Sequence, residues 1–187
     1  MLVGLCALGY AQTSGTTPKA KPTDYPVQAS VGDLVIAAEY LLHSVGTGNG
    51  SFLAPNYLVI EIAVYPAKKQ PVTISSGQFT LRVNGAKEEL PAELAAIAAA
   101  SLKFSDWDGQ GGAPQPVPEQ PRVSDPLNRP VPRSAPEAVT ATAFPGGECT
   151  GPVSGNLYFG YTKKTKLIKT LELIWHHGKE QTVIQLF

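Results

Sequence analysis

The sequence predicts an all-β protein, built as an antiparallel β-sandwich. Near the C-terminus three short apolar runs, 153–159, 167–175 and 181–187, are separated by polar turns. Runs of this length joined by polar turns are typical of consecutive antiparallel strands. The chain also holds 17 prolines and 18 glycines, which is too many turn formers for a helical bundle and consistent with an all-β fold.

Length and charge narrow the class of protein further. A chain of 187 residues suits one domain with appendages. The 15 basic residues balance the 15 acidic ones, so the formal net charge is zero. A nucleic-acid-binding protein would normally carry a basic excess on one face. We therefore expect no nucleic-acid partner.

The N-terminal residues 1–11 are apolar and uncharged, and they predict a signal peptide. Gly9 and Ala11 place small residues at the −3 and −1 positions of a cleavage site. The segment is too short to cross a bilayer, which takes about 20 residues, so no transmembrane anchor is expected in the mature chain. The prediction is a secreted or periplasmic protein. A lipoprotein is less favoured, because Leu5 rather than a small residue precedes Cys6.

Residues 12–24 are small, polar and proline-marked, so we expect a flexible leader before the folded domain at 25–187. After cleavage Cys149 is the sole cysteine of the mature chain, and one thiol cannot close an intramolecular disulfide. A small, partly buried hydrophobic residue is favoured there over a reactive thiol.

The predicted strands of the first half are 25–29, 34–45, 56–65, 72–75 and 78–83. The segment 56–65 is apolar on both faces, which places it centrally in its sheet. Asn84-Gly85 predicts a type I′ hairpin turn. Alternation along the central strands predicts these residues as the core: Leu58, Ile60, Ile62, Val64, Phe79, Leu81, Leu157, Phe159, Leu171, Leu173 and Trp175.

Two segments interrupt the β pattern. Residues 87–101 are dense in alanine, and Leu90, Leu94 and Ile97 recur at helical spacing, so one short helix is expected. Residues 109–136 hold eight prolines. Proline removes a backbone donor and fixes φ, which excludes an interior strand. The segment 109–136 is therefore predicted to be a long proline-rich surface insertion.

The strand sequences resemble a known family. The resemblance rests on these segments: Gly32-Asp33-Leu34 before Glu39-Tyr40, the run 57–64, Pro71-Val72-Thr73-Ile74 leading to Phe79-Thr80-Leu81, Gly146-Gly147, the segment 155–159 and Leu171-Glu172-Leu173. They resemble the bacterial Ig-like extracellular domain of unknown function that occurs in secreted proteins and lipoproteins. The similarity covers about 31–86 and 144–187, and implies an Ig-like β-sandwich in an exported protein. It offers no catalytic residues to carry over.

Residue patterns for metal or catalytic sites are weak. Asp106 and Asp108 are spaced as at the start of a calcium loop, but Val117 stands where the closing acid belongs. His176 and His177 are adjacent on a strand and so point to opposite faces, which disfavours one zinc ion. No nucleophile elbow, phosphate-binding loop or zinc-hydrolase motif is present. We expect no metal, no other cofactor and no enzymatic activity.

The function expected from the sequence is a non-catalytic Ig-like module that mediates protein–protein interaction in the cell envelope. Candidate interaction residues are Arg122, Arg129 and Arg133 of the insertion, and Tyr161, Lys163 and Lys164 of the loop after 153–159. The expected partner is an envelope or extracellular protein, with self-association as a further option.

Two alternatives stay open. One is a structural subunit of an extracellular assembly, in which the leader of one copy pairs with an edge strand of the next. The other is a weak carbohydrate- or metal-binding module, in which aromatic residues stack on a ligand beside the lysines.

Overall fold

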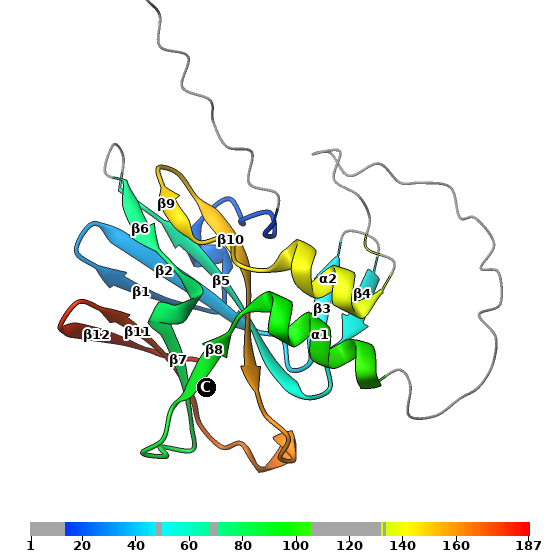
Figure 1. Ribbon diagram of the computed structural model, residues 1–187. Helices are drawn as coiled ribbons and strands as arrows, with labels where there is room; N and C mark the ends of the chain where they lie inside the picture. The colour runs from blue at the N-terminus through cyan, green and yellow to red at the C-terminus, as the bar shows by residue number, and fades with distance from the viewer. Residues whose placement is uncertain (1–13, 48–49, 68–70, 106–131, 133) are drawn as a thin grey trace, which may run out of the picture.

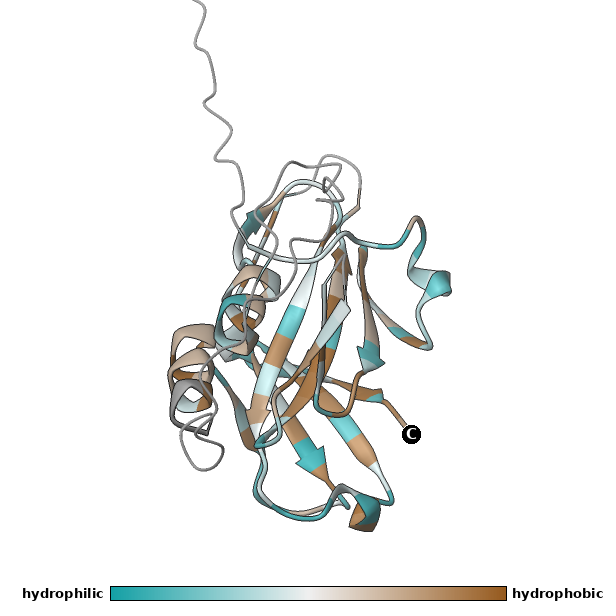
Figure 2. Cartoon of the chain, turned by 90° about the vertical axis from the view of Figure 1, so that its right-hand side faces the viewer, coloured by the Kyte–Doolittle hydropathy of each residue, from teal (hydrophilic) through white to brown (hydrophobic). Residues whose placement is uncertain are grey.

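The computed structural model describes residues 14–47, 50–67, 71–105, 132 and 134–187. Antiparallel strands make up most of this part of the chain, and two short helices lie together on one side of the main sheet (Figure 1). The predicted all-β class is confirmed. Apolar and polar residues alternate along many of the strands (Figure 2), as expected where one face of a sheet covers a core.

The main sheet has eight strands in the order β1-β2-β5-β10-β8-β7-β11-β12. Their bounds are β1 (Val27–Val31), β2 (Leu34–Tyr40), β5 (Tyr57–Tyr65), β10 (Val153–Gly160), β8 (Leu90–Glu93), β7 (Phe79–Val83), β11 (Leu171–His177) and β12 (Glu180–Gln185). The predicted segment 56–65 is central, because β5 pairs with β2 on one side and with β10 on the other.

The sheet bends sharply at β8, which serves as a corner. Leu90 and Pro91 pair with β7, whereas Ala92 and Glu93 pair with β10. A strand that changes partners in this way joins two packed half-sheets. At the other end β1 contacts β12 without a hydrogen-bonded ladder, so the sheet nearly closes into a barrel. The predicted sandwich is thus a single bent sheet, and this topology does not show the Ig-like arrangement.

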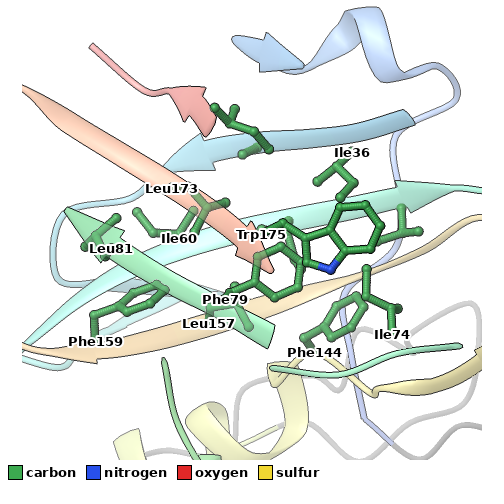
Figure 3. Close-up of a cluster of buried hydrophobic side chains, with 14 of the residues drawn as sticks. Ile36, Ile60, Ile74, Phe79, Leu81, Phe144, Leu157, Phe159, Leu173 and Trp175 are labelled. Atoms are coloured by element: carbon green, nitrogen blue, oxygen red, sulfur yellow. The ribbon is translucent and has the colours of Figure 1, made fainter. Parts of the chain in front are cut away.

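The space inside the bent sheet is filled by one apolar cluster (Figure 3). All the core residues predicted from strand alternation belong to it, which confirms the assigned faces. Trp175 stacks on Phe79, with ring centroids 6.4 Å apart. Cys149 is buried in the same cluster, and burial raises the pKa of its thiol, so the reactive thiolate form is disfavoured.

The helices cover the outer face of β5 and β10. Helix α1 (Ala95–Ser105) packs on α2 (Ala135–Thr142), and both contact β10. Their small residues form a second buried cluster with the outward side chains of the sheet, comprising Val45, Ala54, Tyr57, Val59, Ala98, Ala99, Leu102, Ala138, Val139, Ala143 and Tyr158. Apolar residues on both faces of β5 are thereby explained.

Both helices differ from the sequence-based expectation. The helix predicted at 87–101 begins only at Ala95, because Leu90–Glu93 form the corner strand and satisfy their backbone groups in two ladders. Helix α2 was not predicted at all, and its first residues fall within the predicted insertion 109–136. The Ser134 side chain caps α2 by accepting from the Glu137 N–H at 3.4 Å, and Pro136 lies in the first turn. Insertion residues 109–131 and 133 lie outside the described residues.

Two small sheets complete the fold. One pairs β3 (Ser44–Thr47) with β4 (Gly50–Leu53), and the other pairs β6 (Val72–Ile74) with β9 (Gly147–Cys149). The predicted strand 34–45 is divided between β2 and β3, because Leu42 has a φ of 59° and cannot continue a strand. The predicted hairpin turn is confirmed by positive φ values of 54° and 63° at Asn84 and Gly85.

Candidate functional site

The predicted flexible leader 12–24 is attached to the sheet in its described part. Residues 14–19 are here called the strap. They begin beside the end of α2 and run over the outer face of the sheet to Glu39 of β2 (Figure 1). The Gly15 N–H donates to the Ala141 carbonyl at 2.9 Å, and the Thr16 N–H donates to the Ser154 carbonyl at 3.0 Å. The segment has too little apolar surface to be held by burial, and polar contacts hold it instead.

The strap docks on the edge of β10 that faces away from β5. Along 153–160, β5 pairs with the whole of one side of β10, but β8 pairs with the other side only at Tyr158 and Phe159. On the rest of this edge Thr16 pairs with Ser154 in an antiparallel bridge, and Ala143 pairs with Asn156 in a parallel bridge. The strap therefore occupies the edge of β10 at Ser154, next to the segment that leaves α2.

Gly15 is required by this geometry. Its φ is +113°, a conformation that side chains with a Cβ rarely adopt. A Cβ added at Gly15 would also lie 2.7 Å from the Ser154 carbonyl oxygen, well inside contact distance. Only glycine allows the backbone to approach β10 this closely at that position.

The Thr16 side chain enters a polar group on the outer face of the sheet. Its hydroxyl donates to a carboxylate oxygen of Glu61 at 2.6 Å and lies 2.7 Å from the Ser154 hydroxyl. Because the single Thr16 proton goes to Glu61, Ser154 acts as the donor in the second bond. Glu61, Ser154, Glu39 and Asn156 are here called the strap site.

Glu61 is the charged centre of the strap site. It faces outward from β5, between Glu39 of β2 and Asn156 of β10. Burial is the main cause that raises the pKa of its carboxyl, and the neighbouring Glu39 acts in the same direction. The hydrogen bond from Thr16 and the charge of Lys19 oppose the shift. A partly buried carboxylate of this kind is stabilised by donors that the strap supplies.

Lys19 forms the far end of the strap. Its ammonium group lies 2.7 Å from a Glu39 carboxylate oxygen and 4.4 Å from the centre of the Tyr25 ring. The Tyr65 hydroxyl donates to the Lys19 carbonyl at 2.8 Å. Tyr25 and Tyr65 themselves pack against Ala37 and Ala63, so this end rests on an aromatic platform fixed to the sheet.

Asn156 lies deepest in the strap site, with 2% of its surface exposed. Its amide nitrogen donates to the Thr142 hydroxyl of α2 at 2.9 Å. Its Oδ1 has no hydrogen-bond partner among the described residues. An unpaired buried amide oxygen costs about 1–3 kcal/mol, so this position gains from any donor that reaches it.

A second polar cluster lies on the outer face of β7 and β11. The Thr80 hydroxyl donates to Glu89 at 2.5 Å and lies 2.8 Å from Nε2 of His176. Glu89 also approaches the same Nε2 at 3.3 Å, and it pairs with Arg82 at 2.7 Å. A nucleophile, base and acid in relay need both ring nitrogens of the histidine. Here Nε2 of His176 contacts both the Thr80 hydroxyl and the Glu89 carboxylate, so the cluster is arranged as an ion-pair network.

The interaction residues predicted from the sequence lie apart from the strap site. Tyr161 is buried in the main core, so its side chain is not available as a surface contact. Lys163 and Lys164 are exposed in the loop before the turn η3 (Thr165–Leu167). Arg122, Arg129 and Arg133 lie outside the described residues. Sequence reasoning missed the strap site, although one acidic residue, Glu61, in an otherwise apolar strand was a signal for it.

The described ranges hold neither a metal-binding type of cluster nor a helix suited to cross a membrane. Within 14–47, 50–67, 71–105, 132 and 134–187, histidine, cysteine, aspartate and glutamate nowhere gather in a group of three suited to a metal ion. The predicted start of a calcium loop, Asp106 and Asp108, falls outside these ranges. No helix in the described part of the chain has the length and apolar character that a membrane crossing requires.

No protein-family model matches the chain, and no curated protein matches it. A solved structure of a candidate lipoprotein (ycdA) from Bacillus subtilis is similar at 15% sequence identity and a TM-score of 0.41. The similarity covers 84% of this chain, and the chain spans 37% of the length of that protein.

Proposed function

We propose that this protein is a non-catalytic, secreted or periplasmic interaction module that holds an extended segment of a partner protein along β10. The observation that carries the proposal is the bridge from Thr16 to Ser154, in which the edge of β10 at Ser154 accepts an extended segment. Strand addition of this kind obtains affinity from backbone hydrogen bonds and specificity from alternate side chains. The leader occupies the edge in the absence of a partner.

The chemistry of the site supports binding rather than catalysis. The strap site offers a carboxylate, a hydroxyl and a buried amide oxygen, which are acceptors for the polar groups of a peptide. Glu61 makes its hydrogen bond with the strap and not with a histidine or a nucleophile. An Ig-like relationship and an envelope location, both expected from the sequence, fit a module that binds other exported proteins.

Site-specific cross-linking tests the proposal. A photoreactive residue is placed at Pro152, which is exposed and lies two positions before Ser154, in the full chain expressed in its source cells. The matched control carries it at Val183, an exposed residue of β12. We expect a reproducible intermolecular adduct from position 152 alone, mapped to an extended segment of the captured chain. Identical adducts from both positions, or none from position 152, would contradict the proposal.

A further inference from the structure

We propose that the strap site recognises the sequence Gly-Thr-x-x-Lys, and that a second copy of this chain supplies it, so that two copies exchange straps. The inference rests on the proposed function, because it names a partner for the same edge of β10. The partner is defined by contacts that the chain already makes with itself.

Three strap positions are selected by their chemistry. Gly15 is selected by its positive φ and by the 2.7 Å approach of an added Cβ to the Ser154 carbonyl. Thr16 is selected by its hydroxyl, which bonds both Glu61 and Ser154. Lys19 is selected by its charge, which meets the Glu39 carboxylate and the Tyr25 ring. An extended segment that lacks any of these features loses a specific contact.

The strap can leave its own sheet without exposing the main core. Its side chains are small or polar, and none of residues 14–19 belongs to an apolar cluster. The first large buried side chain after it is Tyr25, which stays with the sheet. A segment held by polar contacts near the surface opens at low free energy compared with global unfolding.

The linker between strap and sheet suits an exchange. Ala20, Lys21, Thr23 and Asp24 are exposed, and the turn η1 (Pro22–Asp24) joins them to Tyr25. Pro18 and Pro22 fix φ at their positions and bias the preceding residues to extended backbone. When two copies exchange identical segments, each lost contact is replaced by an identical one, so the cost is mainly that of association.

The chain's own strap competes with a strap from outside. A short flexible tether gives an effective concentration of about 1 mM, so the closed monomer dominates in dilute solution. A variant with a disabled strap keeps its site open, and its apparent affinity for a free strap rises in proportion to the open fraction. This difference separates binding at the strap site from non-specific association.

The experiment uses the full chain and a fluorescent peptide with the sequence of residues 14–22. Gly15→Val disables the strap and leaves the site intact, and Gly77→Val is the control, because Gly77 is exposed with no atom within 4 Å of an added Cβ. The double variant Thr16→Val, Lys19→Ala disables the strap without a backbone clash, should Gly15→Val not fold. Anisotropy measures peptide binding, and light scattering after size exclusion measures mass.

We expect the strap-disabled chain to bind the peptide at least about 10-fold more tightly than the wild type or Gly77→Val. Peptides carrying Thr16→Val or Lys19→Ala should bind at least about 5-fold more weakly than the native peptide. Wild-type chain should shift from monomer to dimer as its concentration approaches about 1 mM, whereas Gly15→Val should stay monomeric.

The outcomes separate this inference from the proposed function. Peptide binding together with a wild type that stays monomeric up to about 1 mM overturns strap exchange, while the function of the β10 edge stands. Failure of both folded strap-disabled variants to bind the peptide overturns the recognised sequence. The cross-link from Pro152 then decides the proposed function independently, because it reports any segment that lies on the edge.

Discussion

The hydroxyl of Thr16 lies 2.6 Å from a carboxylate oxygen of Glu61, although 45 residues separate the two along the chain. The contact joins a polar N-terminal segment to the central strand of the sheet. Glu61 is partly buried, and the strap supplies the donor that its carboxylate needs. Occupancy of the β10 edge and the ionisation of Glu61 are therefore linked.

Gly15→Val should release the strap and leave the rest of the fold in place. The new side chain would meet the Ser154 carbonyl, and the positive φ at this position disfavours it further. We expect a loss of stability of about 1–2 kcal/mol, the size of a few hydrogen bonds at the surface. Amide hydrogen exchange measures the release directly: the Thr16 N–H should lose its protection, while amides of β5 keep theirs. Retained protection at Thr16 would show that the strap tolerates the change.

Stability should depend on pH through Glu61 in a direction opposite to that of most carboxyls. Its pKa is raised above the ordinary value of 4.5, mainly by burial. Between the ordinary pKa, which applies to the unfolded chain, and the raised pKa of the folded chain, the folded chain binds more protons. Stability therefore falls as pH rises through this window. Glu61→Gln should remove this component and leave stability at neutral pH unchanged or higher. Denaturant unfolding at a series of pH values measures it.

Glu89 provides the control of opposite sign. Its pKa is lowered, first by the hydrogen bond from Thr80, and its pairing with Arg82 acts in the same direction. Stability from Glu89 is present above its ordinary pKa and is lost as pH falls through the lowered value. Glu89→Gln should therefore flatten the acid-side loss of stability. Equal pH profiles for the Glu61→Gln and Glu89→Gln variants would contradict the assigned environments.

Gly155→Ala should destabilise the fold strongly. An added Cβ would lie 2.4 Å from the Cα of Phe144, where the backbone at Ala143 and Phe144 pairs alongside β10. We expect a loss of about 2–4 kcal/mol by chemical denaturation. Gly46→Ala is the matched control in a strand, with open space around the new methyl group, and should change stability by less than about 1 kcal/mol. Similar losses of stability for the two variants would show that the backbone at Phe144 moves away from the new methyl group at little cost.

Ile62→Ala should cost about 2–5 kcal/mol, because the side chain is fully buried in the main core and leaves a cavity. Val183→Ala, on the exposed outer face of β12, should cost less than about 1 kcal/mol. Unfolding monitored by the fluorescence of the buried Trp175 compares the two. A loss below about 1 kcal/mol for Ile62→Ala would contradict the assignment of this face to the core.

Strand periodicity was enough to predict the interior of the fold. Ile60 and Ile62 alternate with outward residues on β5, and the inward set was identified correctly because alternation has a fixed period. The turn at Asn84-Gly85 was predictable for a similar reason, since few residues tolerate positive φ at both positions. Local rules succeed where the outcome depends on near neighbours.

Long-range relationships were not predictable in the same way. The corner at β8 arises because Leu90–Glu93 find two partner strands, and this outweighs the helix propensity of the alanine-rich sequence around them. The strap was assigned as a flexible leader because it has too little apolar surface to bury. Its attachment depends on hydrogen-bond partners that Glu61 and Ser154 bring from strands far along the chain. The Ig-like assignment likewise rested on local patterning, which does not determine how two half-sheets are joined.

The most direct test of strap exchange is complementation between two full-length variants, measured by native mass spectrometry. One chain carries Gly15→Val, with a disabled strap and an intact site. The other carries Glu61→Ala and Ser154→Ala, with an intact strap and neither side-chain hydrogen-bond partner for the Thr16 hydroxyl. We predict that each variant alone is monomeric and that the mixture forms a heterodimer. A mixture that contains only monomers, or homodimers in equal amounts for every variant, would contradict the claim that the edge of β10 binds the strap of another copy.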